Sequence, residues 1–228
     1  MRLTGGLLVG GFLLNVVVTH EHPSGHNDNH PVIFAKYARN HDWVAVHLGQ
    51  FAGILLVLGG FLVLYRVLEL RGEVPVLARF AFGATIATAA IWAVLQAVDG
   101  VALKHAVNAW AHASGAEKSI RFADAETVRS AEEGINSYFR LLLGSTVVLF
   151  GVAIVRTRII AGWLGWVAAV GGLLYMASGI AVAYRGFESG FGDVTGAAVQ
   201  ILFLVFVVGL LVVSVRMKEG RSEAAVRR

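Results

Sequence analysis

The stretch WVAVHLGQFAGILLVLGGFLVLY, residues 43–65, decides the fold of this chain. It contains no Asp, Glu, Lys or Arg over 23 residues. A helix of that length, at about 1.5 Å per residue, spans the roughly 30 Å hydrocarbon core of a bilayer. We therefore interpret residues 43–65 as a transmembrane helix.

Five further apolar stretches have the same character, at 3–19, 76–98, 135–155, 159–182 and 194–215. The first only just reaches the length of a span and could instead be a cleaved signal peptide. However, Val17 and Thr19 stand where a cleavage site would need small residues, so we favour a retained helix. The predicted fold class is an all-α, polytopic integral membrane bundle of six transmembrane helices, located as a multi-pass protein in the cell membrane.

The composition supports this fold class. Of the 228 residues, 57% are hydrophobic and only 15% are charged, and the mean hydropathy is +0.69. Soluble domains carry about 25% charged residues, so lipid is the expected solvent. The chain has no Cys, which excludes disulfides, thiolate metal sites and cysteine nucleophiles.

The basic residues predict the orientation. If the N-terminus is cytoplasmic, eleven of the nineteen Lys and Arg residues lie on the inner side, which favours both termini inside, N-in/C-in. Residues 217–228 then form a cytoplasmic basic tail, residues 20–42 a His-rich outer loop, and residues 99–134 an outer helical loop. Because the basic residues are spread over many short loops, we expect membrane lipids as partners and no nucleic acid. A homo-oligomer is compatible with this pattern.

Small residues recur four apart in several spans, as in Gly6 with Gly10, Gly49 with Gly53, and Ala168 with Gly172. Such pairs let helix backbones approach closely. We therefore predict a compact bundle.

Polar side chains of five different spans are predicted to lie at one depth. Each is sixteen or seventeen residues from an arginine at the inner boundary, about 24 to 26 Å along a helix; they are Gln50, Gln96, Arg140, Tyr175 and Gln200. The common distance places all five in the outer half of the membrane. Polar groups inside a membrane are costly and are therefore candidates for function.

A second tier lies one helical turn farther out. His47, Asp99 and Asn136 stand three or four residues from members of the first layer, so they share a helical face with them. We predict that the two tiers converge on an outward-opening cavity whose ligand-binding residues are Gln50, Gln96, Asn136, Arg140, Tyr175 and Gln200, with Asp99 as the partner of Arg140. Alternatively, Arg140 extends to the surface and the amides only link helices.

All eight histidines fall on the predicted outer side. His20, His22, His26 and His47 are candidate ligands for a divalent metal ion, zinc or copper, because imidazole is a preferred ligand of both. The alternative is a His-rich loop without a specific site, since Pro23 and Gly25 break any helix that would align these ligands. Haem is disfavoured, because the chain lacks the four-helix histidine pattern of b-type cytochromes.

The chain contains no HExxH, GxSxG or Walker motif. For catalysis, the candidate acid, base or metal ligands are His47, Asp99 and Glu133, the last being seven residues before Arg140. The leading functional hypothesis is a site for a metal ion or a small hydrophobic ligand in the outer half of the bundle. The alternatives are a membrane-embedded enzyme acting on a lipid from the outer side, a transporter, and an accessory subunit of a membrane complex. Transport is disfavoured because the inner halves of the spans are nearly free of polar residues.

The run GVAIVRTRIIAGWLGWVAAVGGLLY, residues 151–175, is similar to part of a family of bacterial multi-pass membrane proteins of unknown function. The matching positions are Arg156, Leu164, Gly165, Gly172 and Tyr175. The segments LVLYRVL at 62–68 and ARFAFG at 78–83 resemble the same family, so that about half the chain is covered. The resemblance implies a membrane-spanning helical fold and no mechanism.

Overall fold

The computed structural model describes residues 1–23, 29–70, 76–188 and 190–226. The elements along this part of the chain are α1 (Arg2–His20), α2 (His30–Arg39), α3 (Trp43–Leu70), α4 (Val76–Ala97), the π-helix η1 (Val98–Leu103), α5 (Lys104–His112), α6 (Gly115–Thr157), α7 (Gly162–Arg185), the 3-10 helix η2 (Gly186–Glu188) and α8 (Gly190–Val226). The described residues contain helices and no strand. The predicted all-α fold class is confirmed.

Six helices of the described residues are long and apolar enough to cross a membrane. They are α1, α3, the continuous unit of α4, η1 and α5, then α6, α7 and residues 195–215 of α8. This agrees with the predicted bundle of six transmembrane helices.

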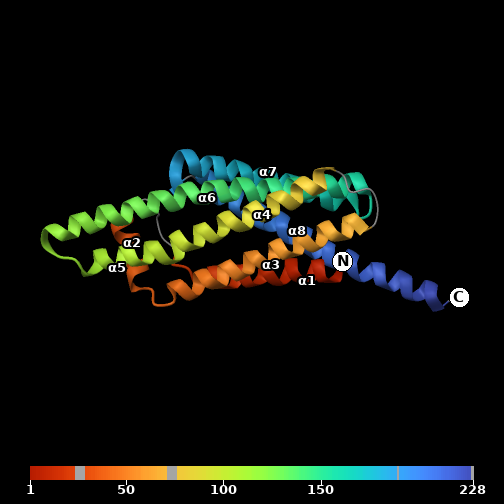
Figure 1. Ribbon diagram of the computed structural model, residues 1–228, viewed down its shortest axis with the longest axis horizontal. Helices are drawn as coiled ribbons and strands as arrows, with labels where there is room; N and C mark the ends of the chain where they lie inside the picture. Colours follow the sequence, from red (N-terminus) through yellow and green to blue (C-terminus); the bar gives the residue numbers. More distant parts are fainter. Residues whose placement is uncertain (24–28, 71–75, 189, 227–228) are drawn as a thin grey trace.

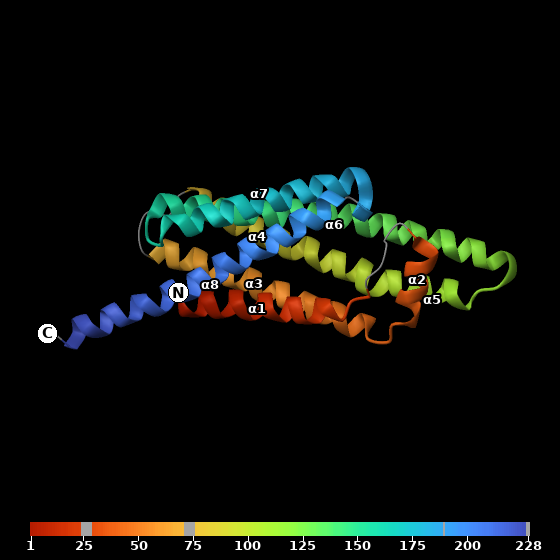
Figure 2. The ribbon, with the colours of Figure 1, turned by 180° about the vertical axis from the view of Figure 1, so that it is seen from behind.

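The six helices form a ring. Each packs on the next in the order α1, α3, α4, α6, α7 and α8, and α8 returns to α1. Figures 1 and 2 show both termini near one end of the bundle and α2 and α5 at the opposite end. The end that carries α2 and α5 is called the outer end here, and the end with the termini the inner end.

The outer end is built by helices that continue beyond the membrane. The 43 residues of α6 measure about 65 Å, roughly twice the thickness of a hydrocarbon core. Its first half runs beside α5 and, together with α2, encloses a second hydrophobic core of Ile33, Phe34, Tyr37, Trp43, Leu103, Val107 and Ala125. The outer segment 99–134 is therefore a helical hairpin that extends two spans.

Lys104 fixes α2 across the top of the ring. Its Nζ donates hydrogen bonds to the carbonyl oxygens of Tyr37 (2.7 Å), Ala38 (2.9 Å) and Asn40 (2.7 Å). The last carbonyls of a helix have no partner within the helix. The ammonium group therefore supplies donors to the C-terminal end of α2 and attaches that end to α5.

The inner half of the ring is filled by aromatic side chains. Phe61 of α3 stacks on Phe150 of α6 with ring centroids 5.1 Å apart, and on Phe206 of α8 at 6.3 Å. All three rings are fully buried. The ring of helices is therefore closed by packed hydrocarbon toward the inner end.

Close helix contacts depend on particular glycines. A Cβ atom on Gly144 of α6 would lie 2.6 Å from the carbonyl oxygen of Gly172 on α7, so only glycine permits this crossing. Gly53 likewise faces the backbone of Asn15 on α1. The prediction of a close contact for Gly6 and Gly10 is wrong, because a Cβ at either position would have no neighbour within 4 Å.

Exposed aromatic residues lie near both ends of α7. Trp163 and Trp166 near the start of α7 are more than half exposed, and so is Tyr184 near its end. The 22 residues from Trp163 to Tyr184 measure about 33 Å, close to the thickness of a hydrocarbon core. Tyr138 of α6, two residues before Arg140, is also exposed, and aromatic residues of this kind are enriched at membrane boundaries.

Candidate metal and ligand site

Three potential metal ligands from three parts of the chain meet at the outer end of the ring. They are His22, which follows α1, His47 in the first half of α3, and Asp99 in η1. One ligand atom from each lies within 4.8 Å of the other two. Nε2 of His47 and Oδ2 of Asp99 are separated by 3.1 Å.

Hydrogen bonds to backbone carbonyls define which imidazole nitrogen of each histidine is free. Nδ1 of His47 lies 2.7 Å from the carbonyl oxygen of Trp43, and Nδ1 of His22 lies 3.0 Å from that of Pro23. A carbonyl oxygen only accepts, so Nδ1 carries the proton in both rings. In a neutral ring, Nε2 then presents a lone pair, which is the arrangement found in histidines that bind metal ions.

Nε2 of His47 is buried and has no hydrogen-bond partner among the described residues. The nearby carboxylate of Asp99 is not aligned with it as a hydrogen-bond acceptor, although the two atoms are only 3.1 Å apart. Both atoms can donate an electron pair, so a metal ion beside them could be bound by both. Neighbouring ligand atoms of a tetrahedral zinc site are about 3.3 Å apart, so the spacing suits a metal ion.

The π-helix η1 places Asp99 at the cluster. Single π turns inside α-helices occur often at functional sites, because the extra residue redirects side chains. Gly100 makes this approach sterically possible, since a Cβ there would lie 2.6 Å from Cβ of His47. In addition, Nε1 of Trp43 donates a hydrogen bond to the carbonyl oxygen of Asp99 (3.2 Å). Backbone and side-chain contacts together hold η1 against α3.

Aromatic rings surround the cluster. The ring of His22 lies 4.9 Å from that of Trp43, 5.2 Å from that of His47 and 5.9 Å from that of Tyr37. Burial lowers the pKa of His22, so its imidazole is neutral and able to bind a metal ion near pH 7. Burial also raises the pKa of Tyr37 to about 12, which keeps its hydroxyl protonated.

Below the cluster lies a cavity of about 630 Å³, within the range of roughly 300 to 1,000 Å³ typical of small-molecule sites. All six transmembrane helices contribute to its wall. Its outer end is polar, with His22, Asp99, Arg129 and Glu132, whereas its inner end is apolar. The apolar end is lined by Ile54, Val57, Leu143, Val147, Phe203 and Phe206.

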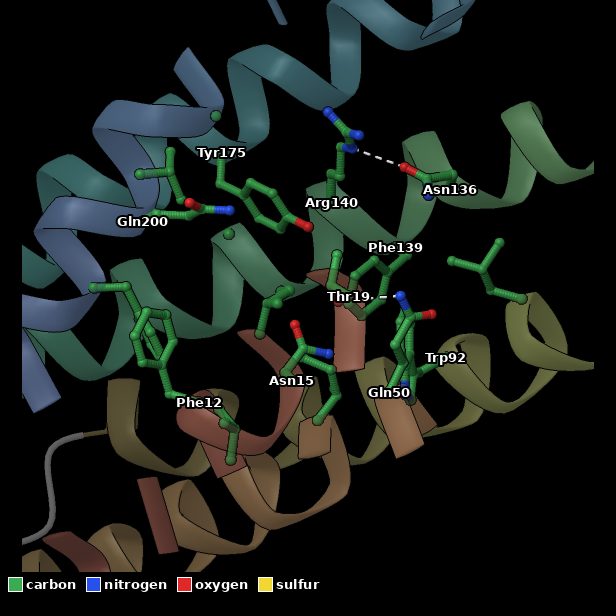
Figure 3. A pocket seen from close by; sticks show the side chains of 18 of the residues that line it. Phe12, Asn15, Thr19, Gln50, Trp92, Asn136, Phe139, Arg140, Tyr175 and Gln200 are labelled. Carbon is green, nitrogen blue, oxygen red and sulfur yellow. Dashed lines mark hydrogen bonds between the residues drawn. The ribbon is translucent and has the colours of Figure 1, made fainter. Parts of the chain in front are cut away.

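The polar layer predicted from helix rise lines this cavity. Gln50, Gln96, Asn136, Arg140, Tyr175 and Gln200 all belong to its wall, and Figure 3 shows five of them, all but Gln96, together around one space. Nε of Arg140 donates to Oδ1 of Asn136 (2.7 Å), and its Nη1 lies 3.4 Å from Oγ of Ser178. The expected pairing of Arg140 with Asp99 is wrong, because Asp99 instead faces His47.

A comparison with protein families identifies the chain. The model of DUF4386, described as a domain of unknown function, matches residues 3–217. The chain belongs to the DUF4386 family. The match extends over most of the chain, well beyond the half that the resemblance of individual segments covered. A search of curated proteins and a search of solved structures gave no match.

In this DUF4386 member, two of the four predicted metal ligands are part of the cluster. His22 and His47 belong to it, whereas His20 is exposed and lies outside it. His26 lies outside the described residues. Asp99, predicted as a catalytic residue, supplies the third ligand atom.

The structure places Glu132, not the predicted Glu133, in the cavity wall. Oε2 of Glu132 forms a buried ion pair with Nη1 of Arg129 (2.7 Å), while Glu133 points toward Gly186 beside α7. The sequence contains a pattern that favours Glu132 over Glu133. Glu132, Asn136 and Arg140 are spaced four residues apart on α6 and therefore share one face of the helix. Arg129 and Tyr37 also line the cavity and were not predicted as site residues. Their spacing along the helices is the same as that of surface residues, so the sequence gives no signal for their burial.

Proposed function

We propose that this protein is a membrane protein that binds a divalent transition metal ion, zinc or copper, through His22, His47 and Asp99. The observation that carries the proposal is the pair of Nε2 atoms left free by the Nδ1 hydrogen bonds, one of them buried beside a carboxylate. Two imidazoles and a carboxylate suit zinc or copper better than calcium or magnesium. The chain has no Cys that could compete for the ion.

The metal content of purified protein tests this proposal. The protein is purified without a polyhistidine tag, stripped with a chelator, and titrated with zinc and with copper. We expect one ion per chain and a loss of affinity of more than about 100-fold in His47→Ala, since even losing a residue that only orients a ligand costs about 10 to 100-fold.

His112→Ala is the matched control. Nδ1 of His112 makes the same bond as that of His47, to the carbonyl oxygen four residues earlier (2.7 Å), but His112 is exposed and lies outside the cluster. Wild-type protein that takes up neither ion would contradict the proposal.

The inner half of the bundle supports a binding site over a transporter. Phe61, Phe150 and Phe206 fill the space through which a substrate would have to pass. Phe206 lines the cavity, whereas Phe61 and Phe150 do not.

A second candidate function is hydrolysis of a lipid ester or amide from the outer side. The specific observation is that the cluster has three protein ligands beside a cavity, whereas structural zinc sites have four. A divalent ion held there would polarise the substrate carbonyl. A water molecule would attack the carbonyl carbon, the bond to the leaving group would break, and a carboxylate of the cavity wall such as Glu132 would pass the water proton to the leaving group.

Hydrolysis of 4-nitrophenyl palmitate by zinc-loaded protein tests this candidate. We expect Glu132→Gln to lower the rate by about 100-fold or more, the usual contribution of a general base. Glu117→Gln, at an exposed position of the same helix, should leave the rate unchanged. A wild-type rate that does not depend on zinc would exclude this function.

A further inference from the structure

The cavity is elongated along the membrane normal. Its wall on α6 runs from Arg129 to Val147, eighteen residues or about 27 Å of helix. The volume of about 630 Å³ is large enough for an extended hydrocarbon chain along this wall.

The cavity has an exposed wall between α1 and α8. Thr19 of α1 and Gln200 of α8 line the cavity and are both exposed. Toward the inner end the two helices touch, with the rings of Phe12 and Phe203 5.6 Å apart and Gly5 against Leu211. Figure 2 shows the helices separating from there toward the outer end. The cavity therefore opens sideways between α1 and α8.

The opening lies at the depth of the outer leaflet if the termini are cytoplasmic, as the basic residues predict. Gln200 is sixteen residues, about 24 Å of helix, from Arg216 at the inner boundary. A hydrocarbon chain could thus enter from the bilayer without passing through water.

The charges at the outer end favour an anionic headgroup once the metal ion is bound, so this inference rests on the proposed function. Arg129 pairs with Glu132 (2.7 Å) and more distantly with Glu133 (4.0 Å), so these three groups carry one negative charge, and the two charges of a divalent ion offset it and that of Asp99. Arg140 adds a further positive charge, because in the described part of the chain it bonds only to the neutral side chains of Asn136 and Ser178 and lies over the ring of Tyr175.

We propose that the cavity binds a single-chain anionic lipid, which enters between α1 and α8 from the outer leaflet. Its headgroup lies between Arg140 and the metal cluster. Its hydrocarbon chain extends past Phe12 and Phe203 toward the stacked rings that close the bundle.

Gly196 provides a variant that fills the cavity. It lies one turn before Gln200 in the cavity wall, and a Cβ there would meet no atom within 4 Å. Tryptophan at this position can therefore occupy the outer part of the cavity without displacing a helix. Gly10→Trp is the matched control, because Gly10 has equally open surroundings but is exposed and outside the cavity wall.

The test uses palmitic acid with a photoreactive diazirine near its methyl end, added to protein in lipid nanodiscs. We expect labelling of residues at the inner end of the cavity, such as Phe12, Leu143 and Phe203. Gly196→Trp should reduce this labelling at least tenfold and Gly10→Trp should not. Unlabelled palmitate and lysophosphatidic acid should compete, whereas uncharged monopalmitoyl glycerol and a diacyl phospholipid should not.

Labelling confined to membrane-facing residues such as Ile201 and Leu204, or unchanged in Gly196→Trp, would overturn the proposal. Metal content is measured on the same samples. Gly196→Trp that loses the lipid but keeps the metal ion supports both sites. Wild-type protein that binds no metal ion but shows the expected labelling would support the lipid site while refuting the metal site.

Discussion

Alanine in place of Gly100 is expected to displace His47 and to lower the affinity for zinc at least tenfold. The added Cβ would lie 2.6 Å from Cβ of His47, closer than real Cβ atoms come to a neighbour, and 3.0 Å from its Cγ. Neither atom belongs to the flexible end of a side chain, so η1 or α3 must shift as a whole. Overpacking of this kind costs about 1 to 3 kcal/mol of stability, and the shift separates Asp99 from His47.

Zinc titration and thermal unfolding of the detergent-solubilised protein measure the two effects. Gly134→Ala is the control, because it lies in the outer half of α6 and its Cβ would meet nothing within 4 Å. An unchanged zinc affinity in Gly100→Ala would show that Asp99 is not a ligand in the arrangement described above.

Methionine in place of Arg129 is expected to destabilise the protein by about 3 to 5 kcal/mol, the usual cost of removing one partner of a buried ion pair. The side chains of Arg129 and Glu132 are only 4% and 5% exposed, and the substitution leaves the carboxylate of Glu132 buried without its cation. It also removes the guanidinium that lies 4.6 Å from the ring centroid of Phe187. The outer part of α6 should therefore loosen from the cavity wall.

The double variant Arg129→Met/Glu132→Met should recover most of this loss, because two apolar side chains of similar size replace the pair without leaving a charge. Chemical unfolding in mixed micelles measures all variants. Arg121→Met provides the control on the same helix, since Arg121 pairs with Glu117 at an exposed position and should contribute about 0 to 1 kcal/mol. Equal losses of stability in Arg129→Met and Arg121→Met would show that burial does not increase the contribution of the ion pair to stability.

That polar residues of several spans contribute to one cavity was predictable from sequence. Helix rise is constant, so counting from Arg156 placed Arg140 in the outer half, and counting from Arg216 placed Gln200 at the same level. Both residues line the cavity. The direction of a side chain around its helix was less predictable, because it depends on how the helices cross. For this reason the sequence pointed to Glu133 where the structure places Glu132 in the cavity.

The sequence by itself determined the six transmembrane helices, of which residues 43–65 are one, because the length of an apolar stretch and the rise of a helix are local properties. Only the tertiary structure decided that His22 and Asp99, 77 positions apart in the sequence, meet at His47. That meeting depends on the π turn of η1, on the close approach at Gly100 and on the segment that follows α1. Spacing along the chain does not encode contacts of this kind, since each arises from the packing of one helix against another.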